Sequence, residues 1–152
     1  MEIQAAIGSL QIDDLDGFVA KRRRIAQQVC RALNGTKLAV IGENTFRNAE
    51  SMKTNSWMLI PIRIIGDNIL ERRERILNTL AKMEIETRPV LTGNFLSQPA
   101  IQRITRNTVD PKSFKFATMI AESSFLVGAH HDLTQKQIQF LCDSLKEVSA
   151  ID

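Results

Sequence analysis

The sequence predicts an α+β domain, in which helices pack on a small sheet of about three strands, antiparallel or mixed. Three observations support this class. Three short runs rich in β-branched and aromatic residues are separated by segments with helical periodicity. A long helical pattern opens the chain, and a second amphipathic helix closes it. Because every link between predicted strands contains a helix, helices packed on one small sheet are the most economical arrangement.

The first predicted element is one long helix over residues 3–33. Asn34-Gly35 gives it a C-terminal stop, and Gly8 and Gly17 weaken it and mark places where it could bend. The run Lys21-Arg22-Arg23-Arg24 fans over most of a helical turn, which favours a solvated helix face over a phosphate contact. The helix is predicted from apolar residues that recur as one stripe: Ile7, Leu10, Leu15, Phe18, Ile25, Val29 and Leu33.

Residues 36–55 read as a loop, and residues 56–65 (SWMLIPIRII) form the clearest strand. Pro61 places this strand at a sheet edge or at a bulge, because proline cannot donate to a central ladder. Arg63 lies among isoleucines and is expected to point to the other face of the sheet or to solvent. An amphipathic helix over residues 69–83 follows.

The second half of the chain predicts a strand at residues 85–87 that continues to Arg88, since Pro89 favours an extended residue before it. A loop and a short helix through Ile104 come next. Asp110 and Pro111 then open a helix that reaches Glu122. Residues 125–127 are the third strand, and the capping box of Thr134 and Gln137 starts the last helix, whose buried stripe is Ile138, Leu141, Leu145 and Val148.

Composition limits the function classes. A chain of 152 residues is expected to form one domain. Its net charge of +3 is weak evidence for nucleic acid, and 5% aromatic residues leave few platforms for base stacking. Cys30 and Cys142 fall in predicted helices and read as buried thiols of a reducing compartment. The sequence has no apolar run that could span a membrane and no signal-peptide pattern, so we expect a cytoplasmic protein.

The loop over residues 84–99 carries the polar groups best placed for a ligand. Arg88 offers a fixed cation at the end of a strand, and Asn94 and Gln98 add two amides. This set suits a polyanionic or polyhydroxylated ligand. An ordinary surface connection is the alternative interpretation.

The pair His130-His131 follows the third predicted strand, with Asp132 next to it. Adjacent residues of an extended chain point in opposite directions, and the chain has no other histidine, so we expect no metal site. One imidazole facing a ligand at the strand end is the functional interpretation, and an unremarkable loop pair is the alternative. The sequence contains no glycine-rich phosphate loop and no nucleophile elbow.

Five stretches, in this order, resemble the C-terminal small domain of the DegT-type nucleotide-sugar aminotransferases. The resemblance implies the small domain of a fold-type I PLP enzyme, with residues 1–152 as a single domain and the large PLP-binding domain absent. The matching stretches are residues 2–8 with Leu10-Gln11 and Leu15, Ser56-Trp57 before residues 60–62, Arg72-Arg73, residues 85–89, and Leu133-Thr134 with Gln137-Ile138.

Two details resemble the branch of this family that removes a sugar hydroxyl, the nucleotide-sugar 3-dehydratases that use PLP or PMP. These details are Gly93-Asn94 with Gln98-Pro99, and residues 125–128 followed by the histidine pair. Ala129 departs from the pattern, because asparagine is expected between Gly128 and that pair. Despite this departure, the two matching details favour dehydration over transamination.

In this family the large domain carries the cofactor and its Schiff-base lysine, or the histidine that replaces it. The resemblance thus implies no catalytic, cofactor-binding or metal residue in this chain, which is expected to be inactive alone. It also implies a homodimeric complete enzyme that acts on a nucleotide-linked 4-keto-6-deoxyhexose in deoxysugar and lipopolysaccharide biosynthesis. Two alternatives stay open: a standalone ligand-binding or regulatory module without catalysis, and a nucleic-acid-binding domain that uses residues 21–24. The residues expected to contact substrate are Arg88, Asn94, Gln98, His130 and His131.

Overall fold

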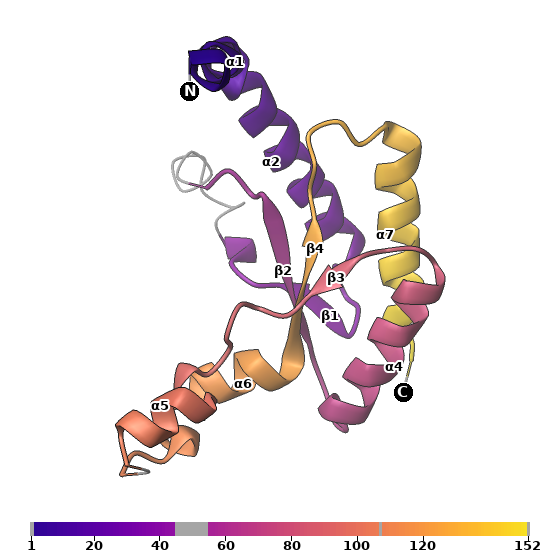
Figure 1. Ribbon diagram of the computed structural model, residues 1–152. Helices are drawn as coiled ribbons and strands as arrows, with labels where there is room; N and C mark the ends of the chain where they lie inside the picture. The colour runs from indigo at the N-terminus through magenta and orange to yellow at the C-terminus, as the bar shows by residue number, and fades with distance from the viewer. Residues whose placement is uncertain (1, 45–54, 107, 152) are drawn as a thin grey trace.

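The protein is described by a computed structural model that covers residues 2–44, 55–106 and 108–151. At its centre lies a four-stranded antiparallel sheet with the strand order β1-β2-β4-β3. Helix α7 packs against both α2 and α4 (Figure 1). Apolar side chains of all three helices join those of the sheet in one core. The α+β class predicted from the sequence is confirmed.

The strands are β1 (Leu38–Val40), β2 (Leu59–Ile64), β3 (Thr87–Arg88) and β4 (Ser124–Gly128). In β2 the alternate residues Ile60, Ile62 and Ile64 are buried, as expected for a strand with one face on the core. Arg63 lies on the opposite face, as predicted, and donates to the sulfur of Met119 at 3.5 Å. Met119 belongs to α6, which therefore covers part of this second face.

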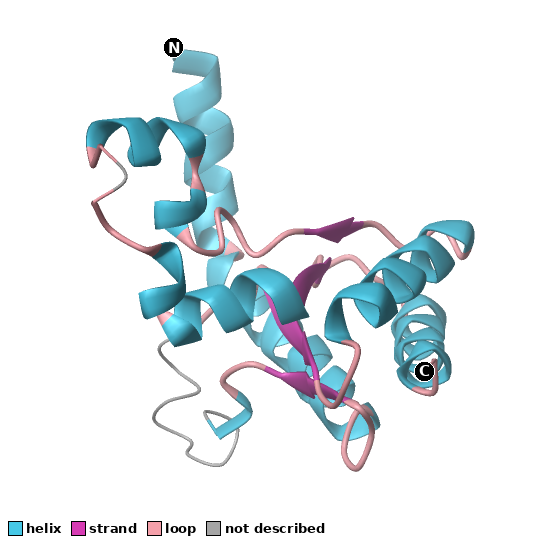
Figure 2. Cartoon of the chain, turned by 90° about the horizontal axis from the view of Figure 1, so that it is seen from below, coloured by secondary structure: helices cyan, strands magenta, loops and turns pink. Residues whose placement is uncertain are grey.

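The helices are α1 (Glu2–Asp13), α2 (Leu15–Ala32), α4 (Ile69–Lys82), α5 (Pro99–Ile104), α6 (Lys115–Ser123) and α7 (Gln135–Ser149), with 3₁₀ turns at Phe95–Ser97 and Pro111–Ser113. The capping box of Thr134 and Gln137 is confirmed at the start of α7. The Asp110 carboxylate accepts the N–H of Lys112, but it caps the 3₁₀ turn, and α6 begins only at Lys115. Figure 2 shows the sheet and its helices from below.

The predicted long N-terminal helix is divided at Asp14, not at a glycine. Asp14 precedes α2 without a side-chain cap, and α1 turns away from α2 at this point (Figure 1). Gly8 and Gly17 both lie within helices. Helix α1 buries no residue, so the first half of the predicted apolar stripe is exposed, including Ile7 at 56% and Leu10 at 69%.

The sheet differs from the prediction in two ways. A fourth strand, β1, lies in the segment predicted as a loop, although residues 45–54 of that segment are outside the described structure. The strand containing Pro61 is central, since β2 pairs with both β1 and β4. Ile41 donates its N–H to the Pro61 carbonyl, so the proline nitrogen faces the chain just after β1 ends. No ladder bond of β1 is lost there, and the predicted edge position is wrong.

In the described part of the chain, no helix combines the length and apolar character needed to cross a membrane. Neither cysteine forms a disulfide within the described residues; Cys142 is buried in α7 and Cys30 is half-buried in α2. Burial raises the pKa of the Cys142 thiol, the neighbouring Asp143 raises it further, and Lys146 opposes the rise.

We expect Cys142 to resist alkylation in the native protein, because both burial and the raised pKa suppress its reactive thiolate. The measurement is the iodoacetamide rate at pH 8 on a Cys30→Ala variant, in which Cys142 is the remaining thiol. The native rate should be at least about tenfold below the rate in urea. Equal rates in the two states would contradict a buried, protonated thiol.

Candidate functional site

A cavity of about 330 Å³ lies at the end of the sheet where β2 begins and β4 ends. Antiparallel pairing places Leu59 opposite Gly128, and the N–H of Ala129 continues the ladder to the Met58 carbonyl at 3.2 Å. Strand β3 and helix α2 supply the other walls. The lining residues are Arg22, Met58, Leu59, Glu86, Arg88, Leu126, Gly128, Ala129 and His130.

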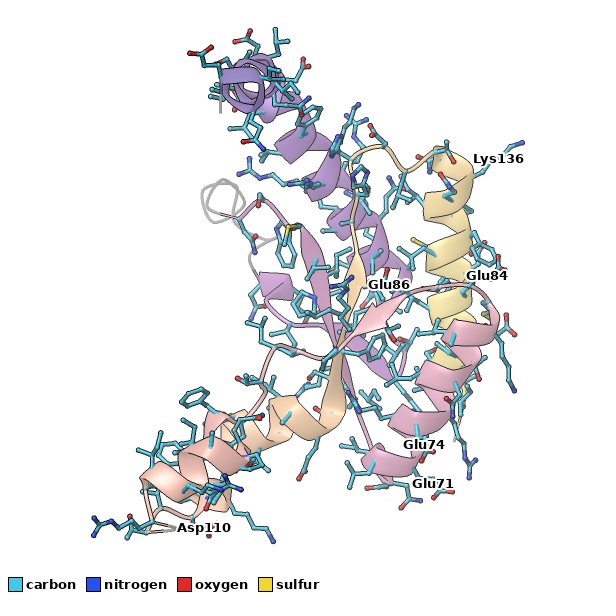
Figure 3. All side chains as sticks on the ribbon, in the orientation of Figure 1. Glu71, Glu74, Glu84, Glu86, Asp110 and Lys136 are labelled. Atoms are coloured by element: carbon cyan, nitrogen blue, oxygen red, sulfur yellow. The ribbon has the colours of Figure 1, made fainter. Side chains whose placement is uncertain are left out.

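Arg88, the last residue of β3, is one of three basic side chains in this cavity. Its guanidinium binds Glu86, with Nε at 2.9 Å and Nη2 at 2.7 Å from the same carboxylate oxygen. Residues two apart on an extended segment share a face, which explains the contact. Glu86 is labelled beside β4 in Figure 3. Both side chains are exposed, so the pair adds little stability, about 0–1 kcal/mol.

Arg22 reaches the same cavity from α2. Its Nε atom is buried and has no hydrogen-bond partner among the residues that the structure describes. The other basic residues of the run 21–24 point elsewhere. Arg23 donates to the Asn55 carbonyl at 2.9 Å, and Lys21 and Arg24 line a second hollow together with Asp132.

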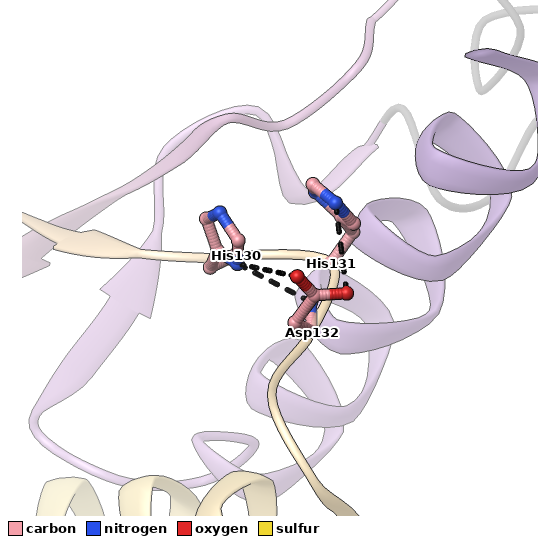
Figure 4. Close-up of side chains that lie close together, drawn as sticks. All are labelled: His130, His131 and Asp132. Carbon is pink, nitrogen blue, oxygen red and sulfur yellow. Dashed lines mark hydrogen bonds and ion pairs between the residues drawn. The ribbon is translucent and has the colours of Figure 1, made fainter. Parts of the chain in front are cut away.

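His130 and His131 stack on each other, with ring centroids 4.4 Å apart and planes at 26° (Figure 4). The expectation that they point in opposite directions is wrong, because the chain leaves its extended form here. Leu133 donates its N–H to the His130 carbonyl at 3.2 Å, which closes a turn. His130 remains largely exposed, whereas His131 is 14% exposed and its ring lies 4.0 Å from that of Phe18 in α2.

Potential metal ligands of His130, His131 and Asp132 lie within 4.8 Å of one another. The Nδ1 atom of His130 already accepts the backbone N–H of Asp132 at 3.3 Å, so this lone pair is in use. Asp132 lies 3.9 Å from His130 Nδ1 and 3.6 Å from His131 Nε2. The sequence-based expectation of no metal site stays a prediction.

Asn94 and Gln98 do not line the cavity that contains Arg88 and His130. Asn94 is 3% exposed, and its amide nitrogen donates to the Pro111 carbonyl at 2.8 Å and to the Thr118 hydroxyl at 2.9 Å. Its oxygen accepts the N–H of Leu96 at 3.1 Å. Gln98 donates to the Thr92 carbonyl at 3.5 Å. Their contacts with substrate stay predictions, as does that of His131.

Sequence analysis missed Arg22 as a site residue, although the sequence holds a signal for it. Phe18, Ile25 and Val29 belong to the predicted apolar stripe of the first helix, and residue 22 falls on the same stripe at helical spacing. An arginine at such a position faces the core side of a helix and not the solvent. Because Arg22 lies within a run of four basic residues, the whole run was interpreted as one solvated helix face.

A family model for the DegT/DnrJ/EryC1/StrS aminotransferase family matches residues 1–146, and the chain belongs to this family. The fold agrees with this assignment. A comparison with curated proteins gave no match.

Three solved structures show the same fold. An aminotransferase from Psychrobacter cryohalolentis has 18% identity and a TM-score of 0.79, over 98% of this chain and 38% of that one. Helicobacter pylori PseC, an aminotransferase of pseudoaminic acid biosynthesis, has 19% identity and a TM-score of 0.78, over 97% of this chain and 37% of that one. Escherichia coli GDP-4-keto-6-deoxy-D-mannose-3-dehydratase, with bound hydrated PLP, has 26% identity and a TM-score of 0.68, over 93% of this chain and 34% of that one. The chain therefore spans about a third of the length of these proteins.

No lysine in the described ranges is placed as a Schiff-base lysine would be. A Schiff-base lysine requires a pocket that orients the cofactor ring and lowers the lysine pKa. Every lysine in the described ranges is exposed, and none lines the cavity of Arg22, Arg88 and His130.

Proposed function

We propose that this chain is the C-terminal small domain of a PLP- or PMP-dependent nucleotide-sugar enzyme, in which it forms one wall of the active site. The cavity lined by Arg22, Arg88 and His130 is the observation that carries the proposal. It gathers cations at the exposed end of a sheet, where another domain can close over it. The family match supports this role as one domain of a larger enzyme. The chain also spans only about a third of the length of the related structures, which supports the same role.

Within the family we favour the 3-dehydratases over the aminotransferases. The E. coli dehydratase is 26% identical to this chain, compared with 18–19% for the two aminotransferases described above. The motifs at Gly93-Asn94 and His130-His131 support the same branch. The substrate would then be a nucleotide-linked 4-keto-6-deoxyhexose, as in deoxysugar formation for lipopolysaccharide. We further propose that the complete enzyme is a cytoplasmic homodimer and that the 152 residues alone do not catalyse the reaction.

The nucleic-acid alternative is not favoured by the arrangement of residues 21–24. Arg22 lines the strand-end cavity, and Arg23 donates to the Asn55 carbonyl. Lys21 and Arg24 line a separate hollow. A phosphate backbone is usually followed by cations on one continuous surface. The following experiment distinguishes an enzyme domain from a standalone binding module.

The test joins this chain to the cofactor domain of the E. coli dehydratase, in place of that enzyme's own small domain. We expect the chimera to consume the GDP-linked 4-keto-6-deoxysugar, while the 152-residue chain alone shows no turnover. Arg88→Ala should lower kcat/KM at least about tenfold, because loss of a charge-assisted contact to the substrate costs more than about 1.4 kcal/mol. The measurement is steady-state kinetics.

Arg75→Ala is the matched control. Arg75 is an exposed arginine of α4 that binds a glutamate on its own helix, as Arg88 binds Glu86. A folded chimera that binds PLP but turns over neither the dehydratase nor the aminotransferase reaction would refute the proposed function. Equal losses for Arg75→Ala and Arg88→Ala would remove Arg88 from the site.

A further inference from the structure

A second cavity, of about 420 Å³, lies between helix α7 and the segment that joins α4 to β3. It shares Glu86, Gly128 and His130 with the strand-end cavity, but neither Arg22 nor Arg88 lines it. Its size and its mainly apolar wall are typical of a pocket for a small organic molecule. The apolar side chains of the wall are Met83, Ile85, Val127, Leu133, Phe140 and Leu141.

Glu84 gives this second cavity an unpaired negative charge. Glu84 and Glu86 are the carboxylates in its wall, and both lie on the segment that leads from α4 to β3 (Figure 3). Glu86 binds Arg88, whereas the exposed Glu84 carboxylate has no hydrogen bond or ion pair with any residue that the structure describes. The cavity therefore offers an apolar wall beside a carboxylate that no cation neutralises.

The backbone at Glu84 shows that this side chain is present at a cost. Helix α4 ends in a turn in which Glu84 donates its N–H to the Ala81 carbonyl at 3.0 Å, and Ile85 donates to the Leu80 carbonyl at 2.9 Å. Glu84 has φ of +59°, in the left-handed region, where glycine is the usual residue of such a turn. A Cβ disfavours this conformation, and strained residues gather at functional sites. The strain thus indicates a role for the carboxylate.

We propose that the second cavity binds a small organic amine, with the ammonium group at Glu84 and the apolar body against Phe140 and Leu141. An ammonium group complements the unpaired carboxylate, whereas an anion would be repelled by the two glutamates of the wall. The ring of Phe140 is 52% exposed, and the face of an aromatic ring attracts a cation.

The amine site is distinct from the strand-end cavity. A cation is disfavoured in that cavity, because Arg22 and Arg88 outnumber the single carboxylate of Glu86. Glu84 and Phe140 line the second cavity and not the first, so substitutions there report on the second cavity alone. The amine site does not depend on the enzyme assignment, since its main contacts lie outside the proposed active-site wall.

The test is titration of the isotope-labelled 152-residue chain with phenethylamine, followed by two-dimensional NMR. Hydrocinnamate is the matched probe, because it has the same phenyl group and linker but carries a carboxylate in place of the ammonium. We expect saturable binding of phenethylamine, with shifts of the amides that line the second cavity. Hydrocinnamate should bind at least about tenfold more weakly, because its charge has the opposite sign.

Glu84→Gly separates binding from folding. Glycine fits the left-handed backbone, so the variant should melt at the native temperature or above it, yet bind phenethylamine at least about threefold more weakly. Glu84→Gln should weaken binding by a similar factor. Glu74→Gln is the control for this change, because it removes an exposed carboxylate of α4 outside the cavity, and it should leave the affinity within about 1.5-fold.

Phe140→Ala should also weaken phenethylamine binding at least about threefold, because it removes the aromatic part of the wall. The proposal is overturned if the native chain does not bind phenethylamine or if hydrocinnamate binds equally well. Equal effects of Glu84→Gln and Glu74→Gln, or shifts confined to the strand-end cavity, would overturn it as well. None of these results would affect the proposed function, which the chimera tests separately.

Discussion

The Phe125→Ala variant is expected to lose about 3–5 kcal/mol of unfolding free energy, the range for deleting a fully buried aromatic side chain. Phe125 is 0% exposed and lies in β4, opposite Ile62 of β2. These are the two central strands of the sheet. Removal of the ring leaves a cavity between the sheet and its helices, which a core made of rigid elements fills only in part.

Urea unfolding followed by circular dichroism measures this loss. Phe140→Ala is the matched control, because Phe140 is 52% exposed on α7. Its loss should stay below about 1 kcal/mol, since truncation there removes little buried area. Similar losses for the two variants would mean that the sheet is not the centre of the core.

Sequence patterns predicted the elements whose identity is set by local periodicity. Helix α7 carries a complete capping box and a stripe of buried residues at helical spacing, and the structure confirms both. Strand β2 alternates buried isoleucines with residues of the other face. In each case neighbours along the chain contain the whole signal.

The features that sequence analysis missed depend on contacts between distant segments. Strand β1 has three residues, too few to show an alternation, and it exists through its pairing with β2. Pro61 can occupy a central strand because β1 ends before the residue opposite the proline nitrogen, so no carbonyl of β1 depends on an N–H at this position. The end of a neighbouring strand cannot be read from the proline or from the residues beside it.

The candidate site was predicted in part. Sequence analysis selected Arg88 and His130, and the structure places both in one cavity. The same reasoning selected Asn94 because it lies in the same loop, yet its side chain binds Pro111 and Thr118. Proximity in the chain grouped these residues, whereas packing separates them. Arg22 enters the cavity from a helix more than sixty residues earlier, a relation that only the fold provides.

Gly93→Ala is expected to destabilise the protein by roughly 2–5 kcal/mol, the sum of overpacking and left-handed backbone costs. Gly93 has φ of +58°, and a Cβ there would lie 2.5 Å from the Cβ and 2.8 Å from the Cα of Ala121. The second contact involves the backbone of α6, so relief requires the loop and the helix to separate. Such a shift would also break the Asn94 bonds to Pro111 and Thr118, which hold the loop to that segment.

Gly8→Ala is the control, because the same substitution there is expected to leave the stability unchanged or to raise it. A Cβ at Gly8 meets no atom within 4 Å, and the residue lies inside α1. Alanine is favoured over glycine by about 0.5–1 kcal/mol at an open helical position, so Gly8→Ala should be neutral or stabilising. Thermal unfolding of the two variants compares them directly. A Gly93→Ala protein as stable as the native chain would show that the loop does not pack closely on α6, and the position of Asn94 would then have to be reconsidered.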